Sequence, residues 1–474
     1  MRKTKIICTL GPASDTREMI RSLIEGGMDM ARFNFSHGTH ESHQQTFRNL
    51  LAIRNDMGKP VGAILDSRGP EVRIGTLKGG KVTLKDNQIF TLTTKQIEGD
   101  SNIVSVTYED LPKDLDTGKR VLIDDGLIEM IVEEIKDTDI ICRVISGAEL
   151  SNRKGINLPG THLSMPYISE QDKEDLLFGI RTGFDYVAAS FVRGKDDLIQ
   201  LREFLDANWG DHINIMAKIE NADGVNNIHE IIEHCDAVMV ARGDMGVEIP
   251  LEELPVIQKY IIKEARMAGK QVVTATQMLE SMVRNPRPTR AESSDVANAI
   301  YDGTSVIMLS GETANGKYPV EAVRTMSRIA ERAEQDIDYA KRFFEYAVHD
   351  KTSNITDAIS HATCLIAYNL DAAAIITVTK TGDTAKMISR FRPDIPIIAC
   401  TPNAETQRQL SLSWGVTALM TGEERVTDIL FEQAVHAAKQ AGLVKNRDLV
   451  VLTAGVPLAM AGTTNLVKVV RVGE

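Results

Sequence analysis

The sequence predicts an α/β protein built from a (β/α)8 barrel, a small β-barrel lid domain inserted into it, and a doubly wound α/β domain at the C-terminal end. Three observations support this fold class. Short apolar runs alternate with helical stretches over the first two thirds of the chain. One long insertion instead alternates polar and apolar residues, as antiparallel strands do. After a long helical stretch, strands and helices alternate again.

Eight apolar, β-rich runs predict the strands of the barrel, at residues 5–10, 30–33, 61–65, 186–189, 214–217, 237–240, 271–274 and 305–309. Helical periodicity between them predicts helices at 16–25, 196–207, 225–232 and 254–268. Eight consecutive βα units close into a TIM barrel of about 250 residues. We therefore expect the barrel to comprise residues 1–70 and 167–345.

The insertion follows the third predicted strand. Its alternating segments predict strands at 81–85, 89–94, 104–108, 127–135 and 140–145, without a long helix between them. We expect a small antiparallel β domain over 71–166, entered through Gly69-Pro70 and left through Pro166. A domain inserted after a barrel strand lies over the strand C-terminal ends, so it is expected to act as a mobile lid.

The last part of the chain predicts a second α/β domain. A long helical stretch at 319–347 precedes predicted strands at 374–378, 395–400, 416–420, 449–452 and 467–471. Helical segments separate these strands, which is typical of an open doubly wound sheet. We expect this domain to span residues 346–474.

The composition excludes several classes of protein. The 474 residues carry a net charge of −12, which repels nucleic-acid phosphates and anionic lipids. No apolar run reaches the roughly 20 residues of a membrane span, and no signal peptide is recognisable. The five cysteines are scattered, which is typical of a reducing compartment. We expect a cytoplasmic protein without nucleic-acid or membrane partners.

Polar residues directly follow the eight predicted strands, and in a barrel these positions converge at one mouth. They are Thr9, Arg32, Asn34, Ser36, Asp66, Ser67, Ser190, Lys218, Glu220, Arg242, Asp244, Thr276, Gln277, Ser310 and Glu312. Lys218 and Glu220 are two residues apart, so they share one face of a strand end. Glu220 and Asp244 follow adjacent strands, and two carboxylates without nearby Cys or His favour Mg²⁺ or Mn²⁺. Ordinary salt bridges at strand ends are the alternative interpretation.

The most specific segment is IMAKIENADG at 215–224. Further distinctive segments lie at 9–14, 31–38, 66–73, 240–246, 275–279 and 285–292. Together, in this order, they resemble the motifs of pyruvate kinases of the bacterial type, without the extra C-terminal phosphohistidine-like domain. The resemblance implies the final step of glycolysis. In that step the phosphoryl group of phosphoenolpyruvate passes to ADP, giving pyruvate and ATP through a Mg-stabilised enolate.

The resemblance also implies a role for each matching residue. The catalytic residues would be Lys218, Arg32, Thr276 and Ser310. Substrate would be bound by Arg32, Gly243, Asp244 and Thr276, and Mg²⁺ by Glu220 and Asp244. Lys218 would stabilise the transferring phosphoryl group and the enolate. A water near Thr276 and Ser310 would protonate the enolate at carbon.

The nucleotide side of the site is implied in the same way. ADP or ATP would contact Asn34, His37, Arg73 and Lys154. A K⁺ ion would be held by Asn34, Ser36, Asp66 and Ser67. Ser67 is more often Thr in similar enzymes, which keeps the hydroxyl. Glu71 resembles the acidic residue of K⁺-dependent members, so we expect K⁺ dependence.

A second binding loop is expected in the C-terminal domain. Thr379, Lys380, Thr381 and Thr384 lie between a predicted strand and a helix, where backbone N–H groups suit a phosphate. In similar enzymes this loop binds a sugar-phosphate effector with help from the loop at 454–464. A well-capped helix start is the alternative. The resemblance also implies a homotetramer.

Two other patterns suggest chemistry that we do not expect. Residues 311–318 nearly match a P-loop, but Tyr318 stands where the Mg²⁺-binding hydroxyl belongs. His37, His40 and His43 are spaced for one helix face, but His40 and His43 are expected to face solvent rather than zinc. Two other functions stay open: a barrel lyase or mutase acting on an α-keto acid, and a non-catalytic metabolite sensor.

Overall fold

The computed structural model describes residues 2–347, 354–456 and 464–474. Its centre is a closed barrel of eight parallel strands in the order β1-β17-β16-β15-β14-β13-β3-β2. The strands are β1 (Lys5–Thr9), β2 (Met30–Asn34), β3 (Gly62–Asp66), β13 (Tyr186–Ala189), β14 (Asn214–Ile219), β15 (Ala237–Ala241), β16 (Gln271–Ala275) and β17 (Val306–Leu309). Each matches a predicted strand to within two residues at either end, so the predicted TIM barrel is confirmed.

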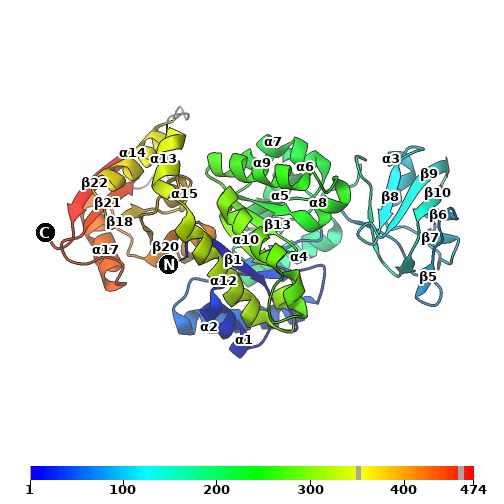
Figure 1. Ribbon diagram of the computed structural model, residues 1–474, viewed down its shortest axis with the longest axis horizontal. Coiled ribbons are helices and arrows are strands. Elements are labelled where there is room, and N and C mark those ends of the chain that lie inside the picture. Colours follow the sequence, from blue (N-terminus) through cyan, green and yellow to red (C-terminus); the bar gives the residue numbers. More distant parts are fainter. Residues whose placement is uncertain (1, 348–353, 457–463) are drawn as a thin grey trace.

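Helices cover the outside of the barrel (Figure 1). They are α1 (Arg17–Gly26), α2 (His40–Met57), α4 (Glu170–Thr182), α5 (Lys195–Ala207), α6 (Ala222–Asn226), α7 (Ile228–Glu233), α8 (Arg242–Glu248), α9 (Leu254–Met267), η1 (Glu280–Val283), α10 (Arg290–Asp302), α11 (Gly311–Ala314) and α12 (Pro319–Asp336). The single helix predicted at 225–232 is wrong. The chain forms α6 and α7 instead, because Asn227 ends the first helix and begins the second.

The inserted domain lies at one end of the barrel (Figure 1). A seven-stranded sheet runs in the order β4 (Val72–Arg73), β12 (Gly155–Asn157), β8 (Arg120–Ile123), β9 (Ile128–Lys136), β10 (Asp139–Ser146), β6 (Ile89–Thr93) and β7 (Ile103–Ser105). An antiparallel bridge between Ile74 and Val106 links its two edges, so the sheet closes on itself. β5 (Lys81–Thr83), β11 (Glu149–Ser151) and the short helix α3 (Leu111–Asp114) complete the domain.

The expectation of a purely antiparallel inserted domain is wrong at one place. β6 and β7 pair in parallel, because the connection between them crosses over instead of forming a hairpin. The remaining strand pairs of the seven-stranded sheet are antiparallel. The predicted β-barrel class therefore holds.

The C-terminal domain lies at the opposite end of the barrel from the inserted domain (Figure 1). Its sheet has the order β20 (Val416–Met420), β19 (Ile397–Thr401), β18 (Ala374–Val378), β21 (Leu449–Ala454) and β22 (Leu466–Arg471). β22 is antiparallel to β21, and the others are parallel. The helices are α13 (Tyr339–Ala347), α14 (Ile355–Asn369), α15 (Asp383–Ser389), α16 (Ala404–Gln409), η2 (Leu410–Leu412) and α17 (Thr427–Gln440). The predicted helical stretch 319–347 breaks between α12 and α13.

The C-terminal domain closes the base of the barrel, where the strands begin. Leu412 of η2 is fully buried in the apolar cluster inside the barrel, together with Met30, Tyr186 and other inward-facing residues. Hydrogen bonds surround it: the Tyr186 hydroxyl donates to Gln409 O (3.3 Å). The Gln409 side chain donates to His212 O (2.7 Å). No helix among the described residues is both long and apolar enough to cross a membrane.

Candidate active site

Lys218 is the centre of a buried polar cluster at the mouth of the barrel. Its side chain leaves the end of β14 and places Nζ 2.6 Å from the Ser190 hydroxyl oxygen. The same nitrogen lies 3.1 Å from Asp66 Oδ1 and 2.9 Å from Glu220 Oε1. Burial disfavours the charged ammonium, but these two carboxylates outweigh it and raise the pKa of Lys218 above its ordinary value. Lys218 is therefore a cation at neutral pH.

Asp66 connects Lys218 with a second cation. Its Oδ2 pairs with the Arg32 guanidinium, and Arg32 also donates to the Thr9 hydroxyl (2.9 Å). Burial alone would raise the pKa of Asp66, but Arg32 and Lys218 together hold it below its usual range. The carboxylate thus fixes two cations side by side, an arrangement suited to a phosphoryl group.

Glu220 lies on the other side of Lys218. Its Oε2 accepts a hydrogen bond from the backbone N–H of Phe191 (2.6 Å), and its carboxyl group is fully buried. Burial raises the pKa of Glu220 to about 7; Lys218 opposes this shift, and the charge of Asp244 adds to it. Phe191 has a φ of 54°, an unusual conformation for a large side chain, which aims its N–H at this carboxylate.

Glu220 and Asp244 fit a divalent cation. Glu220 Oε1 is buried and makes no hydrogen bond within the described part of the chain, so its only partner is the ion pair with Lys218. The electrostatic coupling of Glu220 to Asp244 disfavours two ionised carboxylates there without a cation. Two carboxylate donors suit Mg²⁺, which keeps several waters and substrate oxygens as its other ligands.

Thr276 and Gly243 form a neighbouring subsite. The backbone N–H of Gly243 donates to the Thr276 hydroxyl oxygen (2.7 Å), and that hydroxyl donates to Ala275 O (2.7 Å). Thr276 has a φ of 66°, which costs a β-branched residue about 1–3 kcal/mol. Arg242 holds this backbone through Thr276 O (2.7 Å) and is itself paired with Asp295 (2.8 Å).

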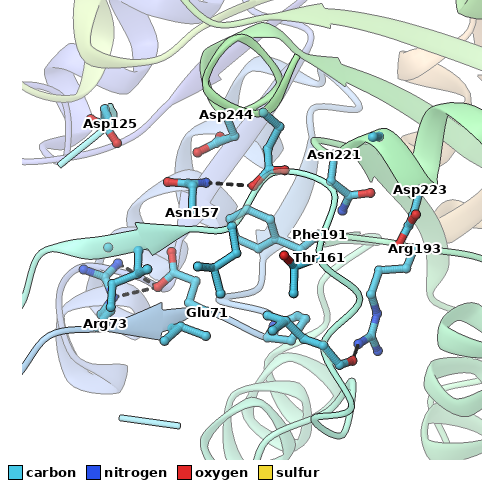
Figure 2. A pocket seen from close by; sticks show the side chains of 18 of the residues that line it. Glu71, Arg73, Asp125, Asn157, Thr161, Phe191, Arg193, Asn221, Asp223 and Asp244 are labelled. Atoms are coloured by element: carbon cyan, nitrogen blue, oxygen red, sulfur yellow. Dashed lines mark hydrogen bonds and ion pairs between the residues drawn. The ribbon is translucent and has the colours of Figure 1, made fainter. Parts of the chain in front are cut away.

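Three of the four expected nucleotide residues line a cavity of about 380 Å³ between the barrel and the inserted domain. His37, Arg73 and Lys154 contribute to its wall together with Asp244, and Asn34 does not. Figure 2 shows the side chains of Glu71, Arg73 and Asp244 around this cavity.

Carboxylates neutralise the three long cations of this cavity, including Arg193, which pairs with Asp197 (2.7 Å). Arg73 pairs with Glu71 (2.7 Å), and Lys154 pairs with Asp124 (2.8 Å). Asp125 also lines the wall; burial raises its pKa, and Asp244 and Asp124 add to the shift. The cavity is thus rich in carboxylates, so a polyphosphate would need accompanying metal ions here.

The expected K⁺ residues lie on two adjacent loops. β2 and β3 pair with Asn34 opposite Asp66, and Asn34 Oδ1 accepts from the Ser36 N–H (3.1 Å). The Ser67 hydroxyl donates to Ala188 O (3.2 Å). The structure therefore brings the four residues into one neighbourhood, where the Asp66 carboxylate is already engaged by Arg32 and Lys218.

Ser310 stands apart from the Lys218 cluster. Within the described residues its hydroxyl oxygen is buried and makes no hydrogen bond, while its backbone N–H donates to Glu312 (2.7 Å).

The near-match to a P-loop at residues 311–318 does not form a phosphate loop, because its first four residues are helix α11.

His40 and His43 are only partly exposed, so the expectation that they face solvent is confirmed only in part. His40 stacks on Phe178 and pairs with Asp175, while His43 stacks on Phe35 and bonds to His37 O (2.8 Å). Aromatic neighbours and a buried carboxylate cover part of these rings. Across residues 2–347, 354–456 and 464–474, no three His, Cys, Asp or Glu side chains form a metal cluster.

The loop expected to bind an effector is internally bonded. Thr379 accepts from the Gly382 N–H (2.9 Å), and Thr381 donates to Asp383 (2.8 Å). Thr384 bonds to Thr464 (2.8 Å), and Lys380 lies 3.3 Å from Glu423. Of the second loop expected here, 454–464, residues 457–463 lie outside the described residues.

Sequence reasoning did not assign roles to several residues of the site. Ser190 was recognised only as a residue after a strand, although it contacts both Lys218 and Asp66. Asp124 and Asp125 carried a weak signal, the turn Asp-Asp-Gly after an apolar strand. No sequence signal indicated the role of the Phe191 N–H, because a backbone N–H does not depend on the residue type.

Comparisons with known proteins agree with this geometry. Residues 1–323 match the family model for the pyruvate kinase barrel domain, and residues 357–470 match that for the pyruvate kinase alpha/beta domain. The chain is 48% identical over 470 residues to the pyruvate kinase of Clostridium acetobutylicum, covering 99% of both chains.

Two further relatives extend the comparison. The pyruvate kinase of Geobacillus stearothermophilus is also 48% identical, and the match covers 99% of this chain and 80% of that protein. A crystal structure of a pyruvate kinase from Cryptosporidium parvum superposes with a TM-score of 0.94 at 40% identity, covering 99% of this chain and 96% of that one. The chain therefore belongs to the pyruvate kinase family.

Proposed function

We propose that the mouth of this barrel performs the pyruvate kinase reaction with Lys218 as its central cation. The observation that carries the assignment is the buried cluster of Lys218, Arg32 and Asp66, which fixes two positive charges side by side. Phosphoryl transfer depends mainly on positioning and on cations around charge spread over oxygens. A cluster of this kind supports a phosphoryl-binding role better than a purely structural one.

The reaction breaks the bond between phosphorus and the enol oxygen of phosphoenolpyruvate and forms a bond to a β-phosphate oxygen of ADP. Arg32 would bind the phosphoryl group, and Lys218 would neutralise the charge that develops on the leaving oxygen. Thr276 and the N–H of Gly243 would bind the substrate carboxylate. A water beside Thr276 and Ser310 would deliver the proton to carbon, and the unbonded Ser310 hydroxyl supports this assignment.

The metal requirements belong to the same proposal. Glu220 and Asp244 would hold Mg²⁺ or Mn²⁺, which when bound supplies positive charge beside the enolate and carboxylate oxygens. Asn34, Ser36, Asp66 and Ser67 would hold K⁺. Glu71, which pairs with Arg73, supports K⁺ dependence through its resemblance to the acidic residue of K⁺-dependent members of the family.

One assay separates this reaction from its competitors. Pyruvate formation from phosphoenolpyruvate is measured with and without ADP, Mg²⁺ and K⁺. We expect turnover only when all three are present, with K⁺ not replaceable by a large organic cation at equal ionic strength. Activity without ADP would favour the lyase, and no activity under any condition would favour the metabolite sensor.

The finer assembly of the protein is also a proposal. We propose domain boundaries at 1–70 with 167–345, 71–166 and 346–474. The main apolar clusters of the three parts support this division, while Phe343 at the last boundary packs with the C-terminal domain. A homotetramer in the cytoplasm, with a sugar phosphate at the loop of Thr379, Lys380, Thr381 and Thr384, follows from the family resemblance. Light scattering would test the oligomer, and a thermal shift with a sugar bisphosphate would test the loop.

A further inference from the structure

Two buried carboxylates of α4 lie behind the loops that carry the proposed K⁺ and nucleotide residues. Asp172 and Asp175 are 3% and 1% exposed, and their spacing of three places them on one face of the helix. α4 is the first helix after the inserted domain (Figure 1). Neither residue contacts the Lys218 cluster or lines the nucleotide cavity.

Asp172 connects the two crossings between barrel and inserted domain. Its Oδ2 accepts from the N–H and hydroxyl of Ser169 (3.2 and 2.6 Å), which caps the start of α4. Its Oδ1 accepts from the backbone N–H of Gly69 (3.3 Å), immediately before Pro70. Gly69 has a φ of 71°, and a Cβ there would lie 2.8 Å from Ser190 O, so the turn requires glycine.

Asp175 holds the two ion-site loops from behind. Its Oδ1 pairs with His40 Nε2 (2.6 Å), and its Oδ2 lies 3.6 Å from Arg68 Nε. Arg68 follows Ser67 in the chain and donates from Nε to Phe35 O (2.9 Å). Phe35 stands between Asn34 and Ser36, so Arg68 joins the β3 loop to the β2 loop.

The neighbouring rings complete this support. His40 stacks on Phe178 of α4, with ring centroids 4.5 Å apart and planes at 12°. His43 stacks on Phe35 at 4.3 Å and bonds to His37 O (2.8 Å). The carbonyls of Phe35 and His37, on either side of Ser36, are therefore both held by side chains.

We infer that Asp175 is a positioning residue that acts through Arg68 and His40 to hold the backbone of residues 34–37 and 66–69 in the geometry that K⁺ and ADP require. The inference rests on the proposed function and deepens it. Residues behind a ligand set commonly change affinity without touching the ligand, because they orient the groups that do. A carboxylate that only filled the core would affect stability and leave these constants unchanged.

The test uses Asp175→Asn in the full-length protein. We expect the half-saturating K⁺ concentration and KM for ADP to rise roughly tenfold. KM for phosphoenolpyruvate should change less than about twofold, because Thr276 and Gly243 follow other strands, β16 and β15. Hydrogen exchange without K⁺ or nucleotide should accelerate at 35–38 and 67–69 and stay unchanged in α9.

Glu174→Gln is the matched control. Glu174 is exposed in the same turn of α4, and its substitution should change none of these quantities. Arg68→Gln removes the same connection from the other loop and should reproduce the pattern. It serves as the deciding variant if Asp175→Asn does not fold.

Three outcomes would overturn the inference. They are reduced stability with unchanged K⁺ and ADP constants, an equal rise in KM for phosphoenolpyruvate, and unchanged hydrogen exchange at 35–38. If the wild-type protein forms no pyruvate, the proposed function fails instead. Hydrogen exchange of the ligand-free variants then still decides whether Asp175 positions these loops.

Discussion

The mouth and the base of the barrel are built from the same eight strands but differ in their chemistry. At the mouth, three carboxylates (Asp66, Glu220 and Asp244) share two cations, Lys218 and Arg32. At the base, the buried carboxylate Asp185 has its own cation and the centre is apolar. Asp185 pairs with Arg408 (2.8 Å) and accepts from the Ala63 N–H (2.9 Å), and Leu412 fills the barrel axis.

This difference distinguishes the mouth, which is suited to binding ions, from the base, which stabilises the fold. The mouth has one negative charge in excess. Burial is the main cause of the raised pKa of Glu220, and the charge of Asp244 adds to it. A divalent cation would relieve that excess, which supports the metal site proposed for Glu220 and Asp244. At the base Asp185 is paired with Arg408, and burial of Leu412 stabilises both the barrel and its contact with the C-terminal domain.

The largest expected effect follows from removing the central cation of the mouth. Lys218→Met should lower kcat about 10³-fold, because the leaving oxygen loses its nearest positive charge. Asp66 keeps Arg32, so the variant should fold. A coupled pyruvate assay measures turnover, and Mn²⁺ titration should show that metal binding is retained. Near-normal turnover would refute the role of Lys218.

The corresponding change at the base should reverse the pattern. Leu412→Ala leaves a cavity in the barrel interior and should lower the free energy of unfolding by about 3–4 kcal/mol. kcat at 25 °C should stay within about twofold, since Leu412 is far from the mouth. Urea unfolding and the same assay provide both numbers. A large loss of kcat in the folded variant would show that the base also controls the chemistry.

The raised pKa of Glu220 predicts that the stability of the protein depends on pH when no metal is bound. Between pH 4.5 and about 7 the unfolded state loses the Glu220 proton while the folded state keeps it. Stability should therefore fall as pH rises through this window, by up to about 3 kcal/mol, and level off above it.

Urea unfolding in EDTA from pH 4 to 8 measures this slope. Glu220→Gln should remove the contribution, and Mg²⁺ should stabilise the wild type more at pH 8 than at pH 5. If the wild type and Glu220→Gln show the same pH profile, the Glu220 carboxyl group is not the source of the pH dependence.

The elements of the barrel were predictable because their signal is local. Strands such as β15 and β16 are buried on both faces, so they appear as continuous apolar runs. The mouth residues were predictable for the same reason, since each follows such a run. The family motifs then identified the residue types.

The pairings were not predictable, because they are tertiary. Lys218 and Asp66 are 152 positions apart, and no periodicity indicates that one carboxylate binds both Lys218 and Arg32. The insertion of Leu412 depends on the docking of another domain. The contacts of His40 were not predictable for the same reason, because Asp175 and Phe178 come from a helix beyond the inserted domain.

The smallest effect compares two strained residues at the two ends. Thr276 at the mouth has a φ of 66°, and Trp209, in the base-side loop before β14, has a φ of 65° and is 84% exposed. Asn tolerates this conformation better than Trp, so Trp209→Asn should raise the free energy of unfolding by about 0.5–1 kcal/mol and leave kcat unchanged.

Relief of the same strain at the mouth should have the opposite functional result. Thr276→Gly adopts a φ of 66° freely but loses the hydroxyl that accepts from the Gly243 N–H. We expect kcat/KM for phosphoenolpyruvate to fall at least tenfold. The free energy of unfolding should change by less than about 1 kcal/mol. Thr276→Ser keeps the hydroxyl and should retain most of the activity. If Thr276→Gly is fully active, the strain at the mouth has no function, and in this respect the two ends of the barrel are alike.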